Sequence, residues 1–422
     1  MNQEKIVIKG GTVIDPVNHI NRIGDVLVAE GKIMSVSSPA PDFTADKVID
    51  AAELIVCPGF IDLCARLREP GETHKASIAS EVKAAFQSGI TTLCCPPDTS
   101  PVIDTPAVAE LILDKAQALG MTKVLPIAAL TQGLLGQELS AMGALKNAGC
   151  IAVSNGRREL TNTLVLRRAM EYAASQDILF ICQPNDAWLQ HQGCAHEGAF
   201  ATRYGLPGIP ETAETIALVQ HLVLVELTGC RMHFSHLSCA RSVALIRNAK
   251  QEGLPVTADV AIHQLHLTEQ DMPAFDSLYH VIPPFRTEQD RQELRQGLAD
   301  GTLDAISSDH QPQDEDAKLG AFPETEPGIA SLDTLLPLAL ELVNDKVVSL
   351  EQAIGLLTHQ PAHVLKIDAG TLTPGNPADL CIFDPKKTWQ ASAENWLSHG
   401  INSPFFGQEL QGKVVQTIKS GQ

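Results

Sequence analysis

Hydrophobic and polar residues alternate near both ends of the chain with the two-residue period of half-buried β-strands. Near the N-terminus, glycine turns separate four such runs: Lys5–Ile8, Thr12–Ile14, Asp25–Val28 and Lys32–Val36. The C-terminal region repeats the pattern at Ala378–Phe383 and Lys413–Ile418. We therefore predict one small β-sandwich domain made from both chain ends, residues 1–57 and 365–422.

The middle of the chain, residues 58–364, follows a different pattern. Short apolar segments of strand length alternate with segments of helical periodicity, such as 165–175, 211–227 and 239–251. Because this alternation implies parallel strands, about eight units in ~300 residues favour an α/β fold of the (β/α)8 TIM-barrel type over an open sheet. Residues that follow the strands would then form the functional face. The predicted strands include 91–94, 124–127, 151–153, 178–181, 232–234, 256–258 and 305–307.

Composition and charge narrow the class of protein. A chain of 422 residues with 44% hydrophobic and 19% charged residues fits a globular protein with one large and one small domain. The formal net charge of −19 would repel phosphate backbones and anionic lipids, so we expect neither nucleic acid nor membrane partners. The N-terminal residues do not resemble a signal peptide, and the ten cysteines include no CxxC pair. We therefore expect reduced thiols and a cytoplasmic location.

Short motifs stand in a fixed order along the predicted barrel. They are PGFID at 58–62, LREPG at 67–71, DTSP at 98–101, FSHLS at 234–238, PPFR at 283–286, SDHQP at 308–312 and GNPADL at 375–380. In this order and spacing the chain resembles the dihydroorotases of the amidohydrolase superfamily, nearly end to end. The resemblance implies a barrel that binds one or two zinc ions through histidines and an acidic ligand. In that family the metal generates hydroxide and polarises the ring amide, while an aspartate moves the proton.

Several zinc ligands implied by the resemblance are replaced in this chain. Where the family has His-x-His, the sequence has Cys64 and Arg66, separated by one residue. Cys64 could bind zinc as a thiolate, but the Arg66 guanidinium stays protonated and has no lone pair to offer. The family's acidic ligand falls on Asn155 and its next histidine on Gln183, and neither amide is a good zinc ligand. We therefore predict a degenerate site without bound zinc.

Two ligand positions are retained. His236 matches the family's remaining histidine ligand, and Asp309 matches the aspartate that binds metal and moves the proton. An ion pair between Asp309 and Arg66 would neutralise both charges. A single weak zinc held by Cys64, His236 and Asp309, or a new site that includes His263, are the alternatives.

The substrate contacts implied by the resemblance are also changed. Arg68 matches the arginine that holds the substrate carboxylate. Asp98 replaces an asparagine and would repel that carboxylate, Ile282 replaces another polar contact, and Gln313 replaces a histidine. We therefore treat Asp309 as a vestigial catalytic residue, and Arg68 and Asp98 as vestigial substrate-binding residues.

The combined losses predict a pseudoenzyme. The chain resembles degenerate dihydroorotase-like proteins that join aspartate carbamoyltransferase as non-catalytic partners. This resemblance implies a hetero-dodecamer with six copies of each chain, and a homodimer when the chain is alone. The alternatives are an amidohydrolase that acts on another cyclic amide with one metal ion, and a sensor that binds a pyrimidine precursor through Arg68.

Overall fold

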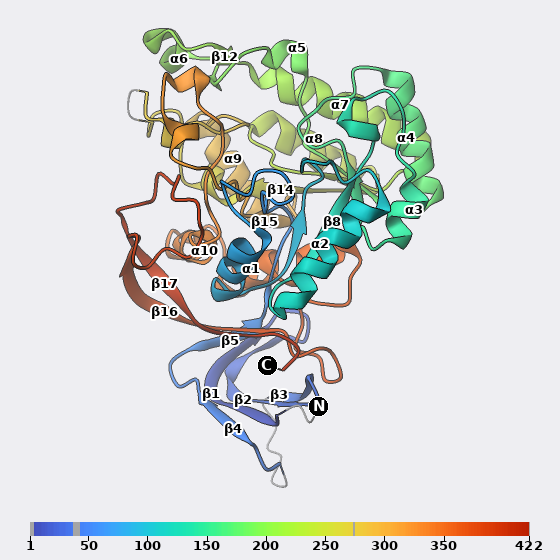
Figure 1. Cartoon of the computed structure of the whole chain (residues 1–422). Coiled ribbons are helices and arrows are strands. Elements are labelled where there is room, and N and C mark those ends of the chain that lie inside the picture. Colours follow the sequence, from blue (N-terminus) through green and yellow to red (C-terminus); the bar gives the residue numbers. More distant parts are fainter. Residues whose placement is uncertain (1–3, 37–42, 273–274, 422) are drawn as a thin grey trace.

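A computed structural model of the chain describes residues 4–36, 43–272 and 275–421. A barrel surrounded by helices forms the larger part, and both ends of the chain enter a sheet beneath it (Figure 1). Within the described residues, no helix combines the length and the apolar character needed to cross a membrane.

The barrel is an eight-stranded parallel sheet whose strands are ordered as they occur along the chain. Its strands are β6 (Phe60–Asp62), β7 (Ile90–Cys95), β8 (Lys123–Ala129), β9 (Ala152–Ser154), β10 (Leu179–Cys182), β13 (Met232–Phe234), β14 (Val256–Ala261) and β15 (Ala305–Ser307). Just beyond β6 and β15, a parallel bridge joins Ala65 to His310, and the backbone N–H of Arg66 donates to the His310 carbonyl at 2.9 Å. The predicted (β/α)8 architecture is thus confirmed as a nearly closed barrel.

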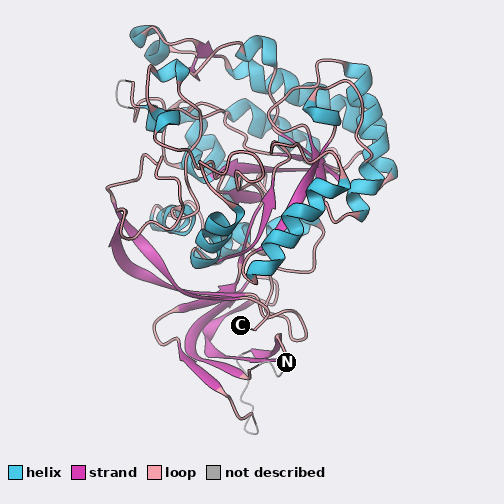
Figure 2. Ribbon diagram, in the orientation of Figure 1, coloured by secondary structure: helices cyan, strands magenta, loops and turns pink. Residues whose placement is uncertain are grey.

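Helices cover the outside of the barrel (Figure 2). Some begin at residues that satisfy free backbone N–H groups: Ser77 forms a capping box at the start of α1 (Ile78–Gln87), and Thr287 forms one at the start of α9 (Glu288–Ala299). The predicted helical segments correspond to α4 (Thr163–Ser175), α7 (Glu211–Thr228) and α8 (Ala240–Gln251). The helices that follow barrel strands are α1 (Ile78–Gln87), α2 (Pro106–Leu119), α3 (Met142–Asn147), α4 (Thr163–Ser175), α7 (Glu211–Thr228), α8 (Ala240–Gln251), α9 (Glu288–Ala299), α10 (Leu335–Asn344), α11 (Leu350–Leu357) and α12 (His359–Leu365).

An excursion between β10 and α7 adds short elements at the carboxyl end of the barrel. It contains α5 (Ala187–Gln190), β11 (Ala195–His196), α6 (Ala199–Tyr204) and β12 (Gly208–Ile209). The two short strands pair in parallel, and Cys194, Ala201 and Phe322 belong to a separate small core beneath them. This core supports the loops around the barrel mouth.

The second sheet has seven strands, and both chain ends contribute to it as predicted. They are β1 (Ile6–Asp15), β2 (Ile20–Ala29), β3 (Lys32–Val36), β4 (Lys47–Asp50), β5 (Ile55–Pro58), β16 (Leu380–Gln390) and β17 (Glu409–Ile418). The sequence predicted two separate strands at 5–8 and 12–14, which is wrong. They form the single strand β1, because a register shift between Ile8 and Gly11 absorbs the glycine pair and lets pairing with β2 continue.

Gly59 connects this sheet directly to the barrel, since β5 ends at Pro58 and β6 begins at Phe60. A Cβ atom on Gly59 would lie 2.2 Å from the Thr91 Cγ2 atom, so only glycine allows the chain to approach β7 this closely. The short connection places the residues after β6 at the barrel mouth.

Candidate functional site

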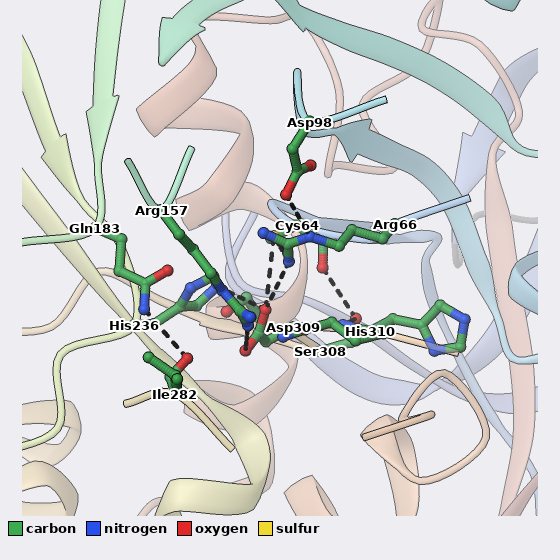
Figure 3. Close-up of polar contacts among 12 residues, drawn as sticks. Cys64, Arg66, Asp98, Arg157, Gln183, His236, Ile282, Ser308, Asp309 and His310 are labelled. Atoms are coloured by element: carbon green, nitrogen blue, oxygen red, sulfur yellow. Dashed lines mark hydrogen bonds and ion pairs between the residues drawn. The ribbon is translucent and has the colours of Figure 1, made fainter. Parts of the chain in front are cut away.

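The candidate site lies at the carboxyl ends of the barrel strands, where the fold gathers residues from distant parts of the sequence (Figure 3). Each predicted ligand position follows a strand: Cys64 and Arg66 follow β6, Asn155 follows β9, Gln183 follows β10, His236 follows β13 and Asp309 follows β15.

Arg66 occupies the middle of the site. Its Nε donates to Asp98 Oδ2 at 2.9 Å, and its Nη1 donates to Asp309 Oδ1 at 3.3 Å. Nη1 also lies 3.8 Å from the Cys64 Sγ. Only 8% of the Arg66 side chain is exposed. Burial alone would lower its pKa, but Asp98, Cys64 and Asp309 outweigh burial and raise it, so Arg66 stays charged.

Asp98 therefore has a partner that the sequence did not reveal. The sequence suggested only that its charge would repel a carboxylate, whereas the structure pairs that charge with Arg66. The Arg66 charge lowers the pKa of Asp98 against the opposing effect of burial.

A second arginine reaches the site, and sequence reasoning missed it. The Nη2 of Arg157 lies 3.9 Å from Asp309 Oδ2, and Arg157 and Arg66 approach Asp309 from different strands (Figure 3). Burial, followed by repulsion from Arg66, lowers the pKa of Arg157 to about 10. Its position just after β9 was the available signal, because residues after barrel strands face the mouth.

Asp309 thus faces two guanidinium groups. Burial would raise its pKa, but His236, Arg157 and Arg66 together lower it to about 2. Asp309 is therefore ionised at neutral pH and accepts from a guanidinium. In this state it is a poor proton shuttle, because the useful pKa of a general acid or base lies near the working pH.

The side-chain amides of Asn155 and Gln183 form hydrogen bonds within the protein. Asn155 accepts from the Thr131 hydroxyl at 2.7 Å and donates to the Arg158 carbonyl at 2.9 Å. Gln183 donates to the Ile282 carbonyl at 3.2 Å (Figure 3). Both amides hold neighbouring loops, and Ile282 contributes to this contact through its backbone.

Two buried histidines near the site, His310 and His233, are held by hydrogen bonds. His310 lies 2.8 Å from Glu81 through Nε2, and its Nδ1 accepts from the Ser331 N–H at 3.0 Å. His233 similarly contacts Thr257 at 2.8 Å and Asp259 at 3.0 Å. These buried histidines have partners on both ring nitrogens, so they support the barrel mouth.

A metal site needs ligand atoms that lie close to one another and no fixed positive charge beside the ion. Only the first condition is met here. Among the described residues, Cys64, His236 and Asp309 form one group whose ligand atoms lie within 4.8 Å of one another. Neither ring nitrogen of buried His236 has a hydrogen-bond partner among the described residues, so one is free to bind a metal, but the second N–H lacks the acceptor that usually orients a histidine ligand. Burial, however, raises the pKa of the Cys64 thiol well above its usual value, which disfavours the thiolate.

Arg66 and Arg157 determine whether a zinc ion fits this site. A unit charge about 4 Å from a divalent ion costs roughly 8 kcal/mol at an effective dielectric of 20, and Arg66 lies beside both Cys64 and Asp309. The residues present therefore do not fit the zinc centre that the resemblance implies.

Within the part of the chain that the structure describes, His263 does not join a second group of possible metal ligands. Burial is the main cause that lowers its pKa to about 4, and its ring packs edge-on against Phe285 with centroids 5.7 Å apart. It lies outside the group of three donors described above.

The residues at the substrate-contact positions that the resemblance implies form hydrogen bonds within the protein. Arg68 donates through Nε to the Pro312 carbonyl and through Nη1 to Glu72, both at 2.8 Å. Gln313 donates to the Pro327 carbonyl at 3.1 Å. With Asp98 they line a pocket of about 460 Å³ next to Arg66.

Comparisons with known proteins agree with the family resemblance and with the barrel fold. A family model described as Dihydro-orotase-like matches residues 53–242. A "Dihydroorotase-like protein" of Pseudomonas aeruginosa is 48% identical over 99% of this chain and 98% of its own length. A "Dihydroorotase" of Geobacter sp. strain M21 is 40% identical over the same shares. The solved L-hydantoinase of Arthrobacter aurescens has a similar fold, with a TM-score of 0.88, 23% identity, and 99% and 95% of the two chains covered.

Proposed function

This chain belongs to the dihydroorotase-like family of the amidohydrolase superfamily, and we propose that it is a catalytically inactive member that acts as a structural partner of aspartate carbamoyltransferase in pyrimidine biosynthesis. The observation that carries the loss of activity is the Arg66 guanidinium, 3.3 Å from Asp309 Oδ1 in the place of a metal ligand. A fixed cation there neither binds zinc nor generates hydroxide.

The ion pairs also support a structural role. In a metalloenzyme, a divalent ion joins residues from several strands and balances their negative charge. Here Arg66 joins the segment after β6 to Asp98 and Asp309, which follow β7 and β15. Removing the metal from such a barrel would leave buried carboxylates unpaired, whereas Arg66 pairs with both carboxylates in this chain.

A protein partner is supported by an apolar face on α7. Ile216, Val219, Val223 and Leu227 are each between 43% and 62% exposed and recur at helical spacing on one side of the helix. Aligned apolar side chains in water are typical of interaction surfaces. We assign this face to the transferase as the first surface to test.

The decisive experiment measures the solution mass, by light scattering after size exclusion, of this chain mixed with aspartate carbamoyltransferase from the same organism. We expect one heavy species with six copies of each chain, and a homodimer when the chain is alone. Val223→Lys should weaken the complex, while Ile23→Lys, which changes a 76% exposed residue on the sheet, should not. Separate peaks for the wild-type chains would refute the partnership.

A single-metal amidohydrolase is the second candidate, favoured by the unpartnered His236 ring and the grouping of Cys64, His236 and Asp309. It predicts stoichiometric bound metal and hydrolysis of a cyclic amide that a chelator abolishes. Our proposal predicts substoichiometric metal and no dihydroorotase turnover, so elemental analysis combined with an activity assay separates the two.

A further inference from the structure

A segment without helix or strand connects the last two strands of the second sheet and crosses onto the barrel. It comprises residues 391–408, between β16 and β17, and we call it the strap. β16 and β17 extend from the lower sheet toward α10 (Figure 1). On the strap, Trp396 is only 8% exposed and packs in a small core with Ala330, which belongs to the barrel part of the chain. The strap therefore joins the sheet made from both chain ends to the barrel.

Asn402 anchors one half of the strap to loops around the barrel mouth. Its side chain donates to the Gln311 carbonyl at 3.0 Å and to the Gly328 carbonyl at 2.9 Å, and it accepts from the Gln313 N–H at 2.8 Å. The Ala330 N–H donates to the Asn402 carbonyl at 3.0 Å. These contacts join neutral amide groups, so they do not depend on pH in the neutral range.

Two buried carboxyl groups hold the other half of the strap. Glu81, on α1, accepts from the Ser398 hydroxyl at 2.7 Å and from the His399 N–H at 3.1 Å. Asp333, just before α10, accepts from the Leu397 N–H at 2.6 Å and from the Ser398 N–H at 3.2 Å. Glu81 and Asp333 are at most 5% exposed. This half of the strap is therefore held by groups whose charge depends on pH.

The two carboxyl groups differ in how their charge is balanced. Glu81 lies 2.8 Å from the His310 Nε2, and this histidine lowers the pKa of Glu81 against the effect of burial. For Asp333, the described residues offer no cationic side chain within ion-pair distance. Burial raises the pKa of Asp333 to about 7, its N–H donors lower it, and the Glu81 charge raises it. Lys413 on β17 and Glu394 on the strap are the other charged residues that line the hollow beside Asp333.

The hollow beside Asp333 gives the strap room to move. It has a volume of about 410 Å³ and lies between the end of α1, the start of α10, β17 and the strap. Asn395 and Leu397 of the strap form part of its wall. An ionised carboxylate is unfavourable when buried without a partner, and water in the hollow would hydrate Asp333 once the strap moves away.

We propose that the strap is a pH-sensitive device, in which the half held by Glu81 and Asp333 detaches from the barrel as pH rises while Asn402 keeps the other half attached. On release, Asp333 gives its proton to water, and the Leu397 and Ser398 N–H groups exchange the carboxyl oxygens for water. Release needs neither a transferase nor a metal ion, so this proposal stands or falls separately from the proposed function.

Hydrogen–deuterium exchange of the full chain at pH 6 and pH 8, followed by mass spectrometry, tests the proposal. Release is linked to the loss of one proton below about pH 7, so the opening equilibrium should rise about tenfold between these pH values. After correction for the intrinsic pH dependence of exchange, protection of peptides within 391–400 should therefore fall about tenfold. Peptides around Asn402 and in β13 should keep their protection. Equal protection of 391–400 at both pH values would overturn the proposal.

Asp333→Asn tests the source of the pH dependence. The variant keeps an acceptor for one strap N–H but cannot ionise, so protection of 391–400 should be lower at both pH values and should no longer change with pH. Glu394→Gln is the matched control, because that exposed carboxylate lines the same hollow but does not accept from Leu397 or Ser398. The control should keep the tenfold change.

A pH dependence that persists in Asp333→Asn, or that disappears in Glu394→Gln, would also overturn the proposal. The comparison of 391–400 with the Asn402 peptides uses the wild-type chain alone. The proposal can therefore fail even if Asp333→Asn does not fold.

Discussion

Arg66→Met tests whether the arginine has taken over the structural task of a metal. The substitution keeps a long side chain but removes the charge that faces Asp309 and Asp98. The Asp309 side chain is 3% exposed, and leaving a buried charge without its partner typically costs 3–5 kcal/mol. Asp98 is 30% exposed and can recover hydration, while Arg157 remains 3.9 Å from Asp309. We therefore expect a loss of about 3 kcal/mol, at the lower end of that range.

Urea unfolding followed by circular dichroism measures the effect, and a double-mutant cycle isolates its cause. Asp309→Asn removes the charge that Arg66 balances, so combining it with Arg66→Met should recover about 2 kcal/mol relative to additive losses. Arg168→Met, at an exposed position, should stay within about 0.5 kcal/mol of the wild type. An Arg66→Met variant as stable as that control, or strictly additive losses, would refute the reasoning.

Three further outcomes are expected. The double variant Cys64→His/Arg66→His should show no dihydroorotase turnover, because Gln183 and Arg157 still oppose a zinc centre; measurable turnover would contradict the proposed inactivity. Dialysis against EDTA should leave the melting temperature unchanged, and a clear decrease would indicate a structural metal. Burial raises the pKa of Asp333 to about 7 from its ordinary 3.8, so the folded state favours the protonated form. The stabilisation present at low pH is then lost as pH rises from about 4 to 7. Asp333→Asn should flatten this dependence, which thermal unfolding at pH 5 and pH 8 measures. Both Asp333 oxygens accept from backbone N–H groups, so the loss of one acceptor should lower stability by a similar amount at both pH values.

The barrel and the sheet from both chain ends could be predicted because both depend on periodicity. The apolar segment 305–307 coincides with β15, and the segment 124–127 lies within the longer β8. Motif order then indicated which residues follow the strands. The register shift in β1 could not be predicted, because a glycine pair reads equally well as a turn or a bulge.

The contacts between strand ends were harder to predict. Sequence alone suggested an ion pair between Arg66 and Asp309, but it gave no reason to place Asp98 on the same guanidinium. The approach of Arg157 depends on how far a long side chain extends across the barrel mouth, which periodicity does not encode. Pairings of this kind follow from three-dimensional proximity, so they emerge only when the barrel is assembled.

The positive charge beside Asp309 makes the barrel mouth independent of the amount of zinc in the cell. The stability of a protein that binds a metal rises with the concentration of free ion, because binding and folding are linked by mass action. Arg66 and Arg157 are part of the polypeptide, so each folded copy carries these cations in a fixed ratio to Asp309. We expect the barrel mouth to form to the same extent in zinc-poor and zinc-rich cells, and any assembly built on it to share that independence from the metal.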